Sequence, residues 1–125
     1  MTAGEPSPEQ IIQFLEANIA SVEQLEILRL LSANRGREWR AAVLARQVQS
    51  PPQVVAQHLI ALEARGLLTL HRGGELACRH GSRTPQLAQM LNHLLQFYNE
   101  RPVSTIRLIY SRLSADARGR LPKSH

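Results

Sequence analysis

The chain has 125 residues, of which 43% are hydrophobic and only 4% aromatic. This length suits one domain with one core, and the apolar content excludes wholesale disorder. The single cysteine, Cys78, cannot form an internal disulfide, which fits a reducing cytoplasm. We expect no membrane span, because no stretch approaches the roughly 20 apolar residues that one needs. Residues 1–7 lack the basic and apolar segments of a secretory signal.

Charge is distributed unevenly along the chain, whose formal net charge is +5. Residues 1–34 contain five acidic residues and one arginine, which gives −4. Residues 35–83 contain eight arginines and three glutamates, which gives +5, and residues 84–125 contain six basic and two acidic residues, which gives +4. A basic middle segment fits a polyanion such as a nucleic-acid backbone. The alternative is a basic surface that faces only solvent.

Two helices are predicted in the acidic segment, and both begin with the same signal. Ser7 is followed by proline, glutamate and then Gln10, and Ser21 is followed three positions later by Gln24. A serine with a glutamine at this distance is typical of a capping box at a helix N-terminus. Apolar residues follow each start at helical spacing, and the polar run 32–37 ends the second helix.

A short break in the basic segment predicts two further helices on either side of it. The third helix spans residues 40–47. Ser50 and Pro51 are the expected N-cap and first residue of the fourth helix, which runs to Arg65 and is closed by Gly66. The residues of these helices and of the second helix that we expect in the core are Leu25, Leu28, Leu44, Val55, Leu59 and Leu62.

A β-hairpin and two last helices complete the predicted order. Residues 67–71 and 75–80 are the expected strands, joined by a two-residue turn at the paired glycines 73 and 74. The fifth helix begins at Thr84 and ends near Asn99, and a short sixth helix spans 103–112. The many apolar residues of these two helices predict a homodimer interface, and the alternative is a monomer in which they fold back over the core.

The order helix, turn, helix, glycine and hairpin resembles the winged helix-turn-helix family, and in particular its bacterial transcription regulators. Three stretches carry the resemblance: residues 39–49, the run SPPQVVAQHL at 50–59, and LEARGLL at 62–68. The resemblance implies a mainly α fold with a small β-hairpin wing and added C-terminal helices. The expected organisation is an N-terminal helix at 1–20, a winged helix-turn-helix domain at 21–83, C-terminal helices at 84–112 and a flexible basic tail at 113–125.

The resemblance also implies a function, which is regulation of transcription by binding double-stranded DNA. In this family the second helix of the motif enters the major groove and the hairpin is a wing. The DNA contacts that it implies here are Arg40, Arg46, Gln53, Val54, Gln57 and Arg72. The arginines would contact phosphate, whereas the two glutamines would each read an adenine through paired hydrogen bonds.

One feature of the fourth helix supports an alternative function. No Lys or Arg lies between Gln47 and Ala64, and the helix carries Val54 and Ile60. Because affinity for DNA depends on neutralised phosphates, this helix alone would bind weakly. The alternative is a winged-helix adaptor that binds another protein through this apolar helix. Ile60 would then face the partner, unless it is buried against the wing or the last helices.

Other reactive residues do not favour catalysis or a metal site. Cys78 and His80 share a strand face, and His71 lies across the hairpin, but zinc sites usually consist of closer Cys and His pairs. Ser82 and Ser111 have no evident base partner. We therefore expect a protein that is not an enzyme and that binds no metal and no cofactor.

Overall fold

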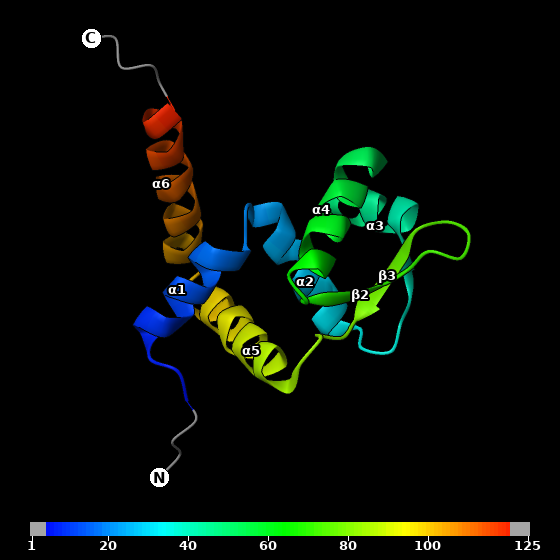
Figure 1. The fold of residues 1–125 in the computed structure, drawn as a ribbon, viewed down its shortest axis with the longest axis horizontal. Coiled ribbons are helices and arrows are strands. Elements are labelled where there is room, and N and C mark those ends of the chain that lie inside the picture. The colour runs from blue at the N-terminus through cyan, green and yellow to red at the C-terminus, as the bar shows by residue number, and fades with distance from the viewer. Residues whose placement is uncertain (1–4, 121–125) are drawn as a thin grey trace.

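The computed structural model describes the backbone of residues 5–120 and the side chains of residues 5–111. Within these limits the chain forms six helices and a three-stranded antiparallel sheet (Figure 1). The elements are α1 (Pro8–Asn18), α2 (Val22–Ala33), β1 (Trp39–Arg40), α3 (Ala41–Val48), α4 (Pro52–Ala64), β2 (Leu68–His71), β3 (Ala77–His80), α5 (Pro85–Glu100) and α6 (Pro102–Arg120). Across residues 5–120, no helix combines the length and apolar character needed to cross a lipid bilayer.

The elements form two halves that share one hydrophobic core. The winged half contains α2, α3, α4 and the sheet, and the other half contains α1, α5 and α6 (Figure 1). The β2–β3 loop lies at the end of the molecule opposite to α6. All six residues predicted for the core of the winged half are at most 1% exposed, which confirms that prediction. The core continues into the other half through Leu15 of α1 and Leu94 of α5.

Side-chain caps begin the first two helices as predicted. The Ser7 hydroxyl accepts a hydrogen bond from the Gln10 backbone N–H (3.2 Å), and the Gln10 side chain accepts one from the Ser7 N–H (2.8 Å). The Ser21 hydroxyl accepts from the Gln24 N–H (3.3 Å). The Gln24 side chain, however, accepts from the Ala20 N–H (2.8 Å) rather than from the cap residue. These bonds satisfy backbone donors that the first helical turn leaves free.

The turn between α3 and α4 has the predicted length of three residues but lies one residue later in the chain. Pro51, not Ser50, is the N-cap of α4, and Pro52 is its first residue. A residue that precedes proline is disfavoured in the α region, so Pro52 keeps Pro51 extended at φ −60° and ψ 142°. The chain reverses at Gln49, which has the left-handed conformation at φ 56° and ψ 52°. This short turn sets α4 across α3, as in a helix-turn-helix.

Replacing Gln49 by glycine is expected to stabilise the protein by about 0.5–1 kcal/mol, because a left-handed backbone is costly for residues other than glycine. Urea unfolding would measure the difference. Gln47→Gly is the matched control, since Gln47 lies inside α3, where glycine costs about 1 kcal/mol. A loss of stability of the same size in both variants would contradict the proposed backbone strain.

The sheet contains a third strand that the sequence pattern did not predict. β1 pairs antiparallel with β3, so the strand order is β1-β3-β2, and Trp39 lies opposite Cys78. A two-residue strand is too short to show an alternating pattern, and it forms here because β3 offers an unpaired edge. Trp39 is 3% exposed, so this short strand places a large side chain in the core.

The predicted two-residue turn at the paired glycines is wrong. His71 pairs with Ala77, which leaves residues 72–76 as a longer loop, and only the second glycine has a positive φ. The observed register places Leu70 opposite Cys78. Shifting it by one residue would place Leu70 opposite Ala77 and move every β3 side chain to the other face. Burial of the apolar face therefore overrides the local preference for a tight glycine turn.

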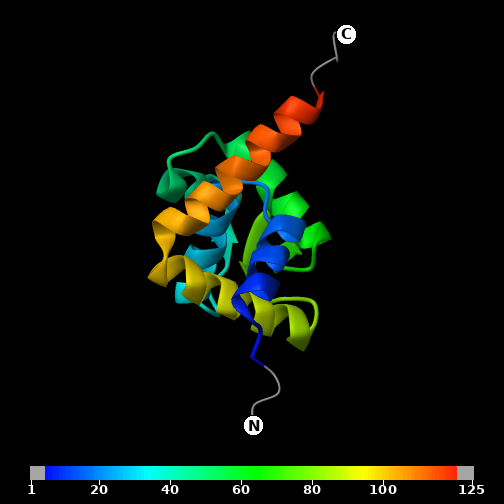
Figure 2. The same cartoon turned by 90° about the vertical axis from the view of Figure 1, so that its left-hand side faces the viewer.

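The last two helices differ in how they meet the core. α5, which has Thr84 as its N-cap, buries Leu91, Leu94, Leu95 and Tyr98 in the core of its own chain. α6 continues to Arg120 instead of ending near residue 112, and its C-terminal part extends beyond the other elements in both views (Figures 1 and 2). The expected flexible tail is thus helical from 113 to 120, and its last residues, 121–125, lie outside the described residues.

Candidate nucleic-acid interface

α4 presents one face to the core and the opposite face to solvent. Val55, Leu59 and Leu62 are completely buried. The exposed residues of the helix are Pro52, Gln53, Val54, Gln57, Ile60, Ala61 and Ala64. The two glutamines predicted to read bases therefore lie one turn apart on the accessible side.

Apolar side chains share this exposed face. Val54 is 37% exposed and Ile60 is 48% exposed. Of the two alternatives for Ile60, burial against the wing or the last helices is thus not observed. The buried stripe of α4 consists of Val55, Leu59 and Leu62, and Ile60 does not lie on it.

Arg40 lies where the wing loop approaches the first turn of α4. Its Nη1 atom is 4.0 Å from Oε1 of Glu75, and both side chains are more than 60% exposed. Glu75 and Gln53 line the same open groove of ≈470 Å³, whose other walls come from the starts of α3 and α4 and from Leu76. The structure thus brings Arg40 and Gln53 to one region of the surface.

Arg72 lies beside the other end of α4. Its Nη2 atom is 3.9 Å from Oε1 of Glu63, which belongs to the last turn of that helix. Arg46 is exposed in the last turn of α3. The predicted arginines are therefore spread around α4 rather than clustered at one of its ends.

The carboxylates beside two of these arginines, Glu63 and Glu75, are residues of the site that the sequence analysis missed. No local pattern reveals them, because each pair joins segments whose approach depends on the hairpin register. Both ion pairs are long and largely exposed. Such pairs contribute only about 0–1 kcal/mol, so either arginine can exchange its carboxylate for a phosphate at little cost.

Several arginines of the basic segment stabilise the fold instead of extending this face. Arg37 stacks over the ring of Trp39, with its guanidinium carbon 3.7 Å from the ring centroid. Arg65 donates a hydrogen bond to a carbonyl oxygen of α1 (2.8 Å), and Arg83 donates one to the Glu63 carbonyl oxygen (2.9 Å). The positive charge available at the candidate interface is thus smaller than the charge of the segment.

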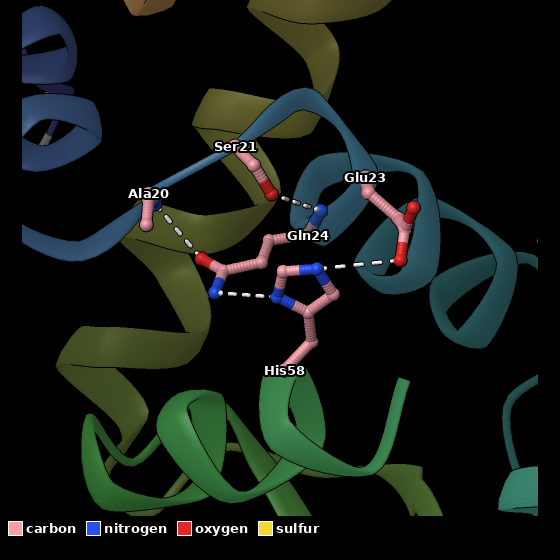
Figure 3. Close-up of polar contacts among 5 residues, drawn as sticks. All are labelled: Ala20, Ser21, Glu23, Gln24 and His58. Carbon is pink, nitrogen blue, oxygen red and sulfur yellow. Dashed lines mark hydrogen bonds and ion pairs between the residues drawn. The ribbon is translucent and has the colours of Figure 1, made fainter. Parts of the chain in front are cut away.

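A partly buried polar network connects α4 to α2 (Figure 3). Because the Gln24 carbonyl accepts from the Ala20 N–H, its amide group faces His58 and donates to Nδ1 (3.1 Å). The neutral ring then carries its proton on Nε2, which lies 3.3 Å from Oε2 of Glu23. Gln24 is only 4% exposed. The network orients the helix turn that carries Gln57.

The residues considered for a metal site do not converge. Cys78 is buried, and burial followed by the charge of Glu38 raises the pKa of its thiol to about 12. Burial and the charge of Arg35 lower the pKa of His80. Among the described residues, no group of three or more His, Cys, Asp or Glu side chains is arranged to hold a metal ion. Cys78 contributes to the core as a small apolar residue.

Comparison with known proteins identifies a structural neighbour but no family. No protein-family model and no curated protein matches the chain. Among solved structures, the chain is similar to the crystal structure of NolR from Sinorhizobium fredii, with a TM-score of 0.50 and 24% sequence identity. The similarity covers 75% of this chain and 95% of the NolR chain. At this identity the similarity concerns the fold alone, and the chain has a winged helix-turn-helix fold with added C-terminal helices.

Proposed function

We propose that this protein is a transcriptional regulator that binds double-stranded DNA, with α4 in the major groove and the β2–β3 hairpin as the wing. The observation that carries the proposal is the arrangement of the α4 face. Gln53 and Gln57 are exposed on it, and Arg40 and Arg72 lie at its two ends. The winged-helix fold supports the proposal, because recognition helices of this architecture are used in this way.

The side chains divide into two classes by what they offer to DNA. Arg40, Arg46 and Arg72 offer guanidinium groups to phosphates, which releases counterions and makes affinity depend on salt. Gln53 and Gln57 offer paired donors and acceptors that match adenine in the major groove. Val54 lies between them and offers an apolar contact for a thymine methyl group.

A test begins with selection of preferred sites from random double-stranded DNA, followed by titrations at several salt concentrations. We expect Arg40→Ala and Arg72→Ala each to weaken binding to all DNA sequences by the same factor. Each should also reduce the slope of log affinity against log salt concentration by about one unit. Gln53→Ala and Gln57→Ala are expected to relax the preference at one base pair by about 1–3 kcal/mol. Arg101→Ala is the matched control, because it removes the same charge at the junction of α5 and α6, away from α4.

The exposed Val54 and Ile60 support a second candidate function, an adaptor that binds another protein through α4. In that case DNA binding would be weak and independent of base sequence, and replacing Gln53 or Gln57 would not change it. Ile60→Glu would abolish binding of the partner. If unbiased selection yields no preferred sequence, the regulator proposal is wrong and the adaptor remains.

We further propose that the regulator acts as a homodimer, since two recognition helices match two half-sites. The apolar residues of α5 are mostly used within its own chain, which leaves α6 as the candidate contact. Val103 and Tyr110 are each 60% exposed and lie two helical turns apart, so they share a face.

Light scattering is expected to find a dimer of the full chain and a folded monomer after Val103→Glu combined with Tyr110→Glu, because two buried charges oppose association. This variant is preferable to truncation after Gly81, which would remove core residues of α5. Ser104→Glu, which adds charge to an exposed neighbouring position, should leave the dimer intact. A full chain that is monomeric at high concentration would refute the dimer.

A further inference from the structure

We propose that a cavity between α2 and the C-terminal end of α3 binds a small organic cation, an amine carried on an apolar body. The cavity has a volume of ≈600 Å³, which is within the range of sites for small molecules. Val22, Leu30 and Val48 provide apolar wall, and Glu23 and Glu26 place carboxylates at it. The site is separate from the exposed face of α4, and it does not depend on the proposed function.

Glu26 is already compensated by groups of its own chain. Its Oε1 atom accepts a hydrogen bond from Arg29 Nη2 at 2.6 Å, and its Oε2 atom accepts one from the Tyr98 hydroxyl. Arg29, which also lines the cavity, is engaged by the same carboxylate. Neither residue is therefore the main attraction for a charged ligand.

Glu23 is the carboxylate with the weaker compensation. Its Oε2 atom is buried and accepts no hydrogen bond within the described part of the chain, although His58 Nε2 lies 3.3 Å away. A buried acceptor without a well-aligned donor is costly, so a donor that enters the cavity would be bound favourably. An ammonium group supplies both the donor and the opposite charge.

The chemistry of the wall narrows the ligand class further. Metal ions in proteins are usually held by several His, Cys, Asp or Glu side chains, and no group of three such side chains is arranged to hold a metal ion within the described residues. The amide side chains of Gln47 and Gln49 add polar contacts at the α3 end. An anion would meet two carboxylates, of which only that of Glu26 is paired with an arginine. The cavity therefore favours an organic monocation over a metal ion or an acid.

Such a ligand would touch the side chains that connect α2 to two other helices. Glu23 faces His58 of α4, and Glu26 receives the hydroxyl of Tyr98 from α5. An amine at Glu23 would compete with the contact to His58 (Figure 3). The bound state would thus be visible in the resonances of α4 as well as in those of the cavity wall.

Three probes with the same indole body and different charge test the proposal: tryptamine, tryptophol and indole-3-acetate. Each is titrated into the full chain without DNA, and two-dimensional amide NMR spectra are recorded. We expect tryptamine to shift the amides of Glu23, Gln47 and Gln49, with affinity at least about tenfold higher than that of neutral tryptophol. Indole-3-acetate should cause no shifts at these positions.

Glu23→Gln keeps the shape of the side chain and removes its charge, so it should weaken tryptamine binding about tenfold. Glu9→Gln removes an exposed charge in the first turn of α1, away from the cavity, and should leave the affinity unchanged. The dispersion of the spectra shows whether each variant is folded. Equal binding of the three probes, equal effects of the two variants, or no tryptamine binding up to about 10 mM would overturn the proposal.

Discussion

Replacing Leu59 by alanine is expected to lower the free energy of unfolding by about 2–5 kcal/mol. Leu59 has no exposed surface and lies on the buried stripe of α4, where the core of the winged half joins the helix. The substitution removes three carbon atoms from a closely packed site that cannot collapse fully around the space left. Since a domain is typically stable by only about 5–15 kcal/mol, the loss should be evident in a thermal melt or in urea unfolding.

Ile60→Ala is the matched control for this substitution. It removes an aliphatic side chain at the next position of the same helix, where the side chain is 48% exposed. We expect a change within about 0.5 kcal/mol, apart from a small gain in helix propensity. A Leu59→Ala variant that unfolds at the same temperature as the unaltered protein would contradict the described orientation of α4.

Replacing His58 by leucine is expected to destabilise the protein by about 1–3 kcal/mol. The leucine cannot accept the hydrogen bond from the Gln24 amide, which is nearly inaccessible to water. The buried amide donor would then lose its partner while the Gln24 carbonyl remains bonded to the Ala20 N–H. Urea unfolding of the full chain measures the effect.

Two further variants distinguish the loss of the Gln24–His58 hydrogen bond from a general effect of replacing a histidine by leucine. His71 is 61% exposed and lies 3.8 Å from Glu38, so His71→Leu should change stability by less than about 0.5 kcal/mol. The double variant His58→Leu, Gln24→Leu should lose less free energy of unfolding than the sum of the losses in the two single variants. The reason is that Gln24→Leu removes the amide that His58→Leu leaves without a partner. Additive losses would show that the two side chains do not act together.

Local patterns predicted most of the helices because their causes are local. A serine at the N-cap and a glutamine three residues later meet within one helical turn, so Ser7 and Gln10 bond as expected. The apolar spacing of α4 likewise identified Val55 and Leu59 as buried. The predicted N-cap of α4 was one residue too early because either of two adjacent prolines could be the first residue of the helix. Pro52 keeps the preceding Pro51 out of the helical conformation, so the helix begins at Pro52.

The sequence also identified the exposed residues of the candidate interface, but not their partners. Helical periodicity is enough to place Gln53 and Gln57 opposite the buried stripe of α4. The ion pair of Arg40 with Glu75 depends on the register of β3, and that register follows from burial of one sheet face. Glycine-rich loops accommodate more than one register, so the turn alone could not predict this contact.

The helices, their buried faces and the basic character of the middle segment follow from residues that are close in sequence. The third strand, the network between Gln24 and His58 and the cavity beside Glu23 arise from segments that meet only after folding. The free energy of each of these features depends on which groups are removed from water when the chain packs. A backbone edge of β3 gains a partner strand, and a carboxylate oxygen of Glu23 is buried without a hydrogen bond. Burial is a property of the packed chain, and for this reason helical spacing and capping signals alone do not reveal these features.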